Sequence, residues 1–258
     1  MRSLYKFLFF HFLTCFGLEE TIGSEIIHGK KVPEQLMLYM ASVQDSSGHH
    51  VCGGFLIAED LVVTAAHCQH GNPTNVVLGA HDLNKIDNDT NRYTAESCLH
   101  PRFANSRTGN DIMLLKLSKK VKMDKNVQKI RFPNSDIKIK DNAKCRVAGW
   151  GFTRNGGKTV NVLQVVDVPF VNLKVCKAKW HHFGLDLPDS AICAGGYGSN
   201  KGFCKGDSGG PLVCGGMAVG VVSFNMRNNC DYPTIPNIYT NISKYRHWIK
   251  DKKRECKM

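Results

Sequence analysis

Short apolar or alternating runs, separated by turn residues, recur along the chain from Ile26 to its end. Runs of this length with Gly, Asn and Asp between them predict β-strands. Many such strands in succession predict an all-β barrel or sandwich. The runs are MLYMASVQ (37–44), GGFLIAEDLVVTAAH (53–67), NVVLGAH (75–81), DIMLLKL (111–117), AKCRVAGWG (143–151), LQVVDVPFV (163–171), PLVCGGMAVGVVSF (211–224) and NIYTNI (237–242).

The clearest helical pattern lies at the C-terminus, in ISKYRHWIKDKKREC (242–256). Apolar residues recur there at helical spacing and share one face, with basic residues on the other. They are Ile242, Tyr245, Trp248 and Ile249. We expect a C-terminal helix over residues 243–256. The lysine-rich stretch 118–132 is typical of a solvated connection, and it is the best place for a seam between two halves, 26–130 and 131–242.

The first residues have the pattern of a secretory signal. Arg2 and Lys6 precede an apolar run over residues 7–18, and the polar stretch that follows ends at Gly23. This predicts a signal peptide over residues 1–23 and a secreted protein. The alternative is a membrane span, but the run is short for a helix of about 20 residues and contains charged or polar interruptions. No membrane span is expected in the rest of the chain.

Composition agrees with a folded, secreted domain. Of 258 residues, 42% are hydrophobic and 22% charged, which excludes a disordered chain. There are 11 cysteines, and Cys15 would leave with the signal, so the rest could all pair. Asn88 and Asn241 begin glycosylation sequons that fit the same route.

The chain is strongly basic, with a formal net charge of +12. Residues 1–25 carry two basic and three acidic residues, so their removal raises the charge to about +13. Such a surface attracts polyanions, among which sulfated proteoglycan is the predicted partner and nucleic acid is not. The alternative is a surface charged only for solubility.

The candidate nucleophile is Ser208. It lies in Gly206-Asp207-Ser208-Gly209-Gly210, which matches the G-x-S-x-G pattern of a serine on a tight turn. In an α/β-hydrolase the acid and histidine would follow, but only 50 residues come after Ser208. The order histidine, aspartate, serine is available instead, from TAAHC (64–68), NDIML (110–114) and Ser208, and it is the order of chymotrypsin-like proteases.

Further motifs strengthen this resemblance over Ile26 to Cys256. The chain resembles the chymotrypsin/trypsin-like serine proteases in IIHG (26–29), CGGFLI (52–57), TAAHC (64–68), NDIMLLKL (110–117), VAGWG (147–151), CAGG (193–196), GDSGGPLVC (206–214) and WIK (248–250). The resemblance implies two packed antiparallel six-stranded β-barrels with a C-terminal α-helix, and a peptidase domain over residues 26–258 that needs no cofactor.

The resemblance also implies roles for these residues. Ser208 would attack the scissile carbonyl, His67 would carry its proton, and Asp111 would orient the imidazole. The amides of Gly206 and Ser208 would bind the oxyanion. Ser223 matches the family's serine beside the catalytic aspartate.

Family members are made as zymogens, so an ion pair between the new amine of Ile26 and Asp207 is implied. Glu25 precedes Ile26, and an activator of trypsin type would not cut there. The dipeptide Ser24-Glu25 resembles that of granzymes, mast-cell chymases and cathepsin G. This subgroup implies activation by a dipeptidyl peptidase, storage in secretory granules on sulfated proteoglycan, protein substrates and inhibitors of the serpin type.

The resemblance implies four disulfides, and leaves two cysteines over. The pairs are Cys52–Cys68, Cys145–Cys214, Cys176–Cys193 and Cys204–Cys230. The last pair is absent from chymases, cathepsin G and the granzyme B group, and resembles granzymes A and K. Cys98 and Cys256 either bridge internally, which we favour slightly, or one of them links two chains.

The specificity pocket is expected to be neutral. Gly202 stands six residues before Ser208, where trypsin-like members carry aspartate, so cleavage after Lys or Arg is disfavoured. Bulky Phe203, and Asn225 and Asn237 at two positions usually occupied by glycine, would narrow the slot. We expect small or medium uncharged substrate side chains.

Two other functions fit the sequence less well than a serine protease. A heparin-binding or antimicrobial homologue with weak or no catalytic activity is the alternative, but no triad residue is missing. A metal site at His49-His50, His181-His182 or His67-Cys68 is rejected because adjacent residues do not share a strand face and no paired ligand spacing is present.

Overall fold

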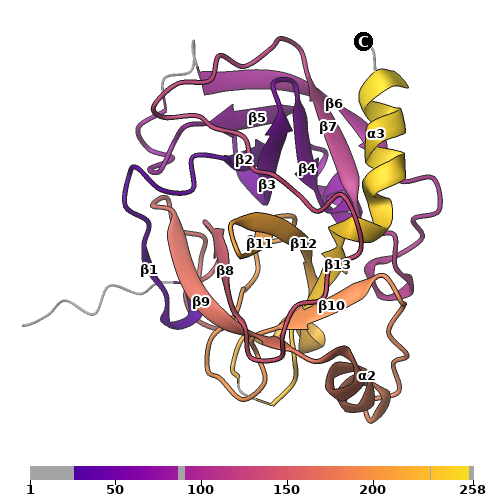
Figure 1. Ribbon diagram of the computed structural model, residues 1–258. Coiled ribbons are helices and arrows are strands. Elements are labelled where there is room, and N and C mark those ends of the chain that lie inside the picture. Colours follow the sequence, from indigo (N-terminus) through magenta and orange to yellow (C-terminus); the bar gives the residue numbers. More distant parts are fainter. Residues whose placement is uncertain (1–25, 87–90, 233, 256–258) are drawn as a thin grey trace, which may run out of the picture.

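Two closed antiparallel β-barrels make up most of the regular structure (Figure 1). The computed structural model describes residues 26–86, 91–232 and 234–255. The predicted signal and dipeptide (1–25), Asn88 and Cys256 lie outside them. The first barrel has the strand order β2-β3-β4-β7-β6-β5. Its strands are β2 (Met40–Gln44), β3 (His50–Ala58), β4 (Leu61–Thr64), β5 (Asn75–Leu78), β6 (Arg92–Leu99) and β7 (Met113–Leu117).

The second barrel repeats this arrangement in the order β8-β9-β10-β13-β12-β11. It is closed because β8 pairs with β9 on one side and with β11 on the other. Its strands are β8 (Lys144–Gly149), β9 (Gln164–Val171), β10 (Ala191–Ala194), β11 (Pro211–Cys214), β12 (Met217–Phe224) and β13 (Ile238–Asn241). The predicted all-β fold of two six-stranded barrels is therefore confirmed.

Each barrel encloses its own core of branched and aromatic side chains. Phe55, Leu56 and Leu114 are fully buried in the first, and Leu212 and Tyr239 in the second. Burying one such side chain contributes roughly 1.5–3 kcal/mol. These residues belong to the apolar runs from which the strands were predicted. The same apolar positions therefore form the strands and fill the barrel cores.

The N-terminal segment crosses to the second barrel. Ile26 is fully buried among the core residues of that barrel. The short strand β1 (Lys30–Lys31) then pairs with β9, with Lys30 opposite Val165. The residues that would follow the activation cleavage are thus built into the barrel that carries Ser208.

Within the described residues, two α-helices lie outside the barrels. Helix α2 (Leu173–His181) follows β9, and α3 (Arg246–Glu255) ends the described chain and lies along the first barrel in Figure 1. Ile249 and Tyr245 are buried in the first barrel's core. The helix begins at Arg246, later than predicted, because a 3₁₀ turn over Ile242–Tyr245 precedes it and is capped by the Asn241 side chain.

Four disulfides brace the described residues: Cys52–Cys68, Cys145–Cys214, Cys176–Cys193 and Cys204–Cys230. Cys98 is disulfide-bonded as well. No helix within the described ranges has the length and apolar character needed to cross a membrane.

Candidate active site

The three triad candidates lie in loops of both barrels, and Cys68 Sγ, next to His67, lies 3.8 Å from the carbonyl oxygen of Ser208. His67 lies in the 3₁₀ helix Ala66–Gly71 after β4, Asp111 just before β7, and Ser208 just before β11. The Ser208 turn is fixed to both barrels, because its carbonyl accepts a hydrogen bond from Gly53 N (2.8 Å) and the next amide donates to Val222 O (2.9 Å).

Asp111 and His67 are joined by two hydrogen bonds. His67 Nδ1 lies 2.8 Å from Asp111 Oδ2, and the His67 amide donates to Oδ1 at 2.9 Å. The Asp111 side chain is fully buried and also accepts a hydrogen bond from the Ser223 hydroxyl. Burial alone would raise the pKa of Asp111, but the bonds from His67 and Ser223 and the charge of His67 hold it below its ordinary value.

This contact fixes the imidazole tautomer. An ionised carboxylate only accepts hydrogen bonds, so the proton must lie on His67 Nδ1. The other ring nitrogen, Nε2, is then unprotonated and able to accept a proton. The pair therefore supplies a base that solvent can reach, since His67 is partly exposed whereas Asp111 is not.

Two peptide groups beside Ser208 are held in orientation by hydrogen bonds to their carbonyl oxygens. Lys205 O accepts from Phe152 N (2.8 Å), and Asp207 O accepts from Gly210 N (3.0 Å). Because the peptide is planar and trans, the N–H groups of Gly206 and Ser208 point away from those partners. Neither N–H donates a hydrogen bond to any described residue. The pair is available to an anion.

Gly206 must be glycine. Its φ of +97° is unfavourable for other residues, and a Cβ would lie 2.9 Å from the Gly151 Cα. This backbone conformation is the physical reason why small residues surround Ser208, as predicted.

His50 also holds this turn, and sequence reasoning missed it. Its Nε2 lies 2.9 Å from Gly206 O, and its Nδ1 lies 2.8 Å from Ser42 Oγ. Burial lowers the pKa of His50 to about 4, so the ring is neutral; because a carbonyl can only accept, Nε2 donates to Gly206. The only signal in the sequence was a histidine two residues before CGGF (52–55).

Asp207 is the second buried aspartate of the site. Its carboxyl accepts hydrogen bonds from the amides of Gly151 and Cys204, both at 2.8 Å. Burial raises its pKa to about 7. No ion pair to Asp207 is found within the described residues, and in the continuous chain the Ile26 nitrogen is an amide and carries no charge.

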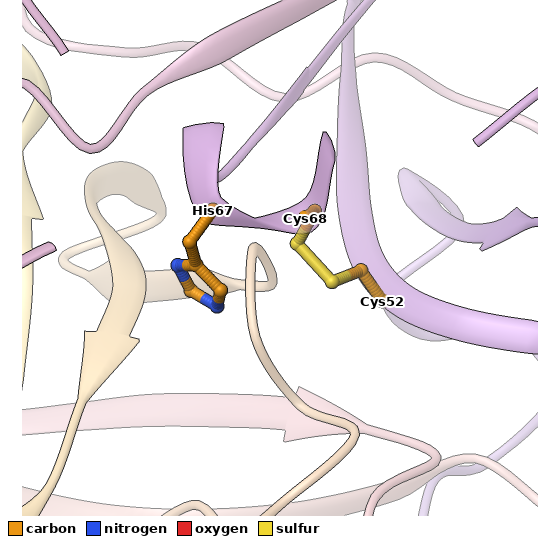
Figure 2. Close-up of side chains that lie close together, drawn as sticks. All are labelled: Cys52, His67 and Cys68. Atoms are coloured by element: carbon orange, nitrogen blue, oxygen red, sulfur yellow. A yellow bond between two sulfur atoms is a disulfide. The ribbon is translucent and has the colours of Figure 1, made fainter. Parts of the chain in front are cut away.

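The disulfide Cys52–Cys68 lies beside His67 (Figure 2). The three side chains are close enough to share an ion, with ligand atoms within 4.8 Å of one another. Both sulfurs are bonded to each other, however, and a disulfide supplies no thiolate to a metal. The cluster therefore braces the histidine loop.

The four predicted pocket residues lie close together, around a residue that sequence reasoning missed. The hydroxyl of Tyr232 donates to Phe203 O and meets Asn225 Nδ2 at 3.3 Å and Asn237 Nδ2 at 3.0 Å. A Cβ at Gly202 would lie 2.6 Å from Tyr232 Cε2. The Phe203 ring itself packs edge-on against Tyr239 in the second barrel's core. Nothing in the local sequence around Tyr232 indicates this position.

A buried Asp–His pair at the seam of two six-stranded barrels, beside a serine on a glycine turn, defines the chymotrypsin-like serine proteases as a class. The chain belongs to the trypsin family, whose family model (Trypsin) matches residues 26–249.

The relatives agree with this family and with the predicted subgroup. Granzyme-like protein 2 of Rattus norvegicus is 39% identical over 95% of this chain and 96% of its own. Duodenase-1 of Bos taurus is 36% identical over 91% and 92%, and cathepsin G of Homo sapiens is 34% identical over 92% and 90%. The chain is a trypsin-like serine protease related to granzymes and mast cell proteases.

Proposed function

We propose that this protein is a secreted, granule-stored serine endopeptidase that hydrolyses peptide bonds through Ser208, His67 and Asp111. The observation that carries the proposal is the Asp111–His67 contact, which leaves Nε2 as a base. Support also comes from the burial of Asp111 and from the two unengaged amides beside Ser208.

In the proposed reaction, Ser208 Oγ bonds to the substrate carbonyl carbon while its proton passes to His67 Nε2. The resulting oxyanion accepts hydrogen bonds from the amides of Gly206 and Ser208. His67 then gives the proton to the leaving amine as the C–N bond breaks, which leaves an acyl-enzyme. The oxygen of a water molecule then bonds to the acyl carbon while its proton passes to His67 Nε2, and His67 returns that proton to Ser208 Oγ as the acyl carbon–Oγ bond breaks and the acid product leaves.

Activation is proposed to follow cleavage between Glu25 and Ile26. The new ammonium group would pair with Asp207, whose carboxyl has only two amide partners and a pKa raised by burial to about 7. A buried carboxylate without a cation is costly, so the pair would favour the ordered turn around Ser208. Acidic Glu25 favours removal of Ser24-Glu25 by a dipeptidyl peptidase.

The S1 pocket receives the P1 side chain, the one on the acyl side of the cleaved bond. Gly202 and the two buried asparagines Asn225 and Asn237 provide no charge there. We propose that P1 is small or medium and uncharged. A P1 peptide library tests this on enzyme beginning at Ile26, with Ser208→Ala as the control. Strong cleavage after Lys or Arg would overturn the pocket assignment, and no cleavage at all would favour the alternative of a non-catalytic homologue.

Sulfated proteoglycan is the proposed storage partner. The net charge of +12 supports it, as do Lys120, Lys129 and Lys253, which line one hollow with Glu59 and Asp60. Retention on a heparin column tests this proposal, and a protein that elutes at the salt concentration expected of a neutral protein would contradict it.

A further inference from the structure

Tyr232 occupies the place where a substrate side chain would be expected. All four predicted pocket residues contact this one residue, three of them at its hydroxyl and one at its ring. The hydroxyl reaches the carbonyl of Phe203 and the amides of Asn225 and Asn237, and the ring lies against Gly202. The phenol is therefore held inside the pocket.

The hydroxyl is fully satisfied there. A phenol has one donor and two lone pairs. The donor goes to Phe203 O, and each lone pair faces one asparagine amide. Burial raises the pKa of Tyr232 to about 12, so the hydroxyl keeps its proton at physiological pH. The contact is not a pH switch, and its polar partners are arranged for a neutral phenol.

The covalent structure holds the ring in place. Tyr232 follows Cys230 by two residues, and Cys230 is bonded to Cys204, four residues before Ser208. Ile27 and Phe152 pack with this disulfide and with Tyr232 in one apolar cluster. On the other side, Tyr197 and Thr234 form an isolated β-bridge. The chain on both sides of Tyr232 is thereby tied to neighbouring segments.

We propose that Tyr232 fills the S1 pocket with its own phenol ring and is the residue that determines which P1 side chains this enzyme accepts. The inference rests on the proposed protease function. With the ring in place, the proposed P1 range narrows to its small end, to side chains such as those of alanine and glycine. A side chain at Gly202 would collide with both Asn237 Nδ2 and the Tyr232 ring.

Removal of the ring would leave a pocket suited to tyrosine. The groups that face the phenol are one carbonyl acceptor and two amide donors. In addition, Asn237 Oδ1 is buried and has no hydrogen-bond partner within the described residues. A site built to bond a hydroxyl discriminates strongly against substrates that lack it. The opened pocket should therefore prefer P1 tyrosine to P1 phenylalanine.

The test compares peptide substrates that differ only at P1, carrying Ala, Tyr, Phe or Lys. Wild-type enzyme beginning at Ile26 should prefer P1 Ala. In Tyr232→Ala, kcat/KM for P1 Tyr should rise about tenfold or more, with a smaller rise for P1 Phe and little change for P1 Ala. Tyr232→Phe keeps the ring and should stay closed to P1 Tyr. Phe183→Ala, which removes an exposed aromatic ring on the surface, is the matched control and should change nothing.

A soluble ring mimic gives a second readout. Millimolar p-cresol should inhibit Tyr232→Ala competitively and leave wild type unaffected. If Tyr232→Ala does not fold, Tyr232→Leu retains apolar contact with Ile27 and Phe152, and it should show the same gain for P1 Tyr. The wild type also tests the proposal without any variant, because efficient wild-type cleavage after Tyr would overturn it.

All variants are first labelled with diisopropyl fluorophosphate, a serine reagent that has no P1 side chain. If no protein is labelled at Ser208, the proposed protease function fails. If all are labelled but Tyr232→Ala shows no gain for P1 Tyr, only the role of Tyr232 fails.

Discussion

Asp207 lies in the Ser208 turn itself and Asp111 just before β7, and both side chains are fully buried. Asp111, at the seam between the barrels, accepts hydrogen bonds from His67 and Ser223, and its pKa is held below its ordinary value despite burial. Asp207 meets only two backbone amides, and burial raises its pKa to about 7. Equal burial thus gives opposite results, because the partners differ. The hydrogen bonds from His67 and Ser223 already stabilise the Asp111 anion, whereas Asp207 has no cationic partner among the described residues.

The largest effect is expected at Asp111. In Asp111→Asn the side chain amide can donate to the imidazole, so the wrong tautomer is favoured and kcat should fall about 10⁴-fold with KM little changed. The measurement is steady-state hydrolysis of an alanyl peptide substrate. Asp186→Asn is the matched control, because Asp186 also contacts a histidine Nδ1, that of His181, but on the exposed surface. Equal losses in both variants would contradict the account.

The next effect concerns Asp207 in the uncleaved precursor. Its folded pKa is raised above its unfolded value, so the folded chain holds an extra proton between about pH 4 and pH 7. The free energy of unfolding should fall as pH rises through this window, by on the order of 4 kcal/mol. Urea unfolding of the Ser208→Ala precursor, with and without Asp207→Asn, isolates this contribution from that of other groups.

After cleavage before Ile26, we expect the new ammonium group to keep Asp207 ionised. The pH-dependent loss should then disappear from the mature protein. If precursor and mature protein showed the same loss relative to their Asp207→Asn variants, Ile26 would not be the missing cation.

A smaller effect is expected at His50, which positions the oxyanion amides through the Gly206 carbonyl. Loss of a direct oxyanion donor costs about 10²–10³ in kcat. His50→Ala acts one step away, so kcat should fall about tenfold with KM unchanged. His49→Ala removes the exposed neighbouring histidine and should have no effect. A change in KM alone would indicate a role in substrate binding.

The smallest effect is expected in heparin binding by the basic surface, away from both aspartates. Ser208→Ala should elute from heparin at the same salt concentration as wild type, because the substitution removes no charge from the basic surface. Lys129→Ala with Lys253→Ala should elute at lower salt, since exposed charge contacts are screened. Earlier elution of Ser208→Ala would link the active site to polyanion binding.

The sequence predicted the fold, and it named His67 and Ser223, which hydrogen-bond to Asp111, for a physical reason. Strand periodicity is local, and the triad residues lie in motifs that hold their own backbone conformation, such as the turn around Ser208. The C-terminal helix was predicted from its apolar face, although the 3₁₀ turn before it moved its start to Arg246.

The pocket side could not be predicted to the same degree. His50 and Gly206 are 156 residues apart, and Tyr232 and Phe203 are 29 apart. These contacts depend on how irregular segments cross in space, and neither residue type is distinctive in its local context. The sequence predicted Gly202, Phe203, Asn225 and Asn237 as lining residues of the pocket, whereas the contacts of Tyr232 with them emerged only from the packing.

The central claim is that Ser208 is a nucleophile activated by the His67–Asp111 pair. Its most direct test is peptide mass spectrometry after reaction with a serine-directed phosphonate. In the protein that begins at Ile26, we predict an adduct on Ser208 that forms far more slowly in the precursor and in Asp111→Asn. An activated protein that never carries the adduct at Ser208 would contradict the account.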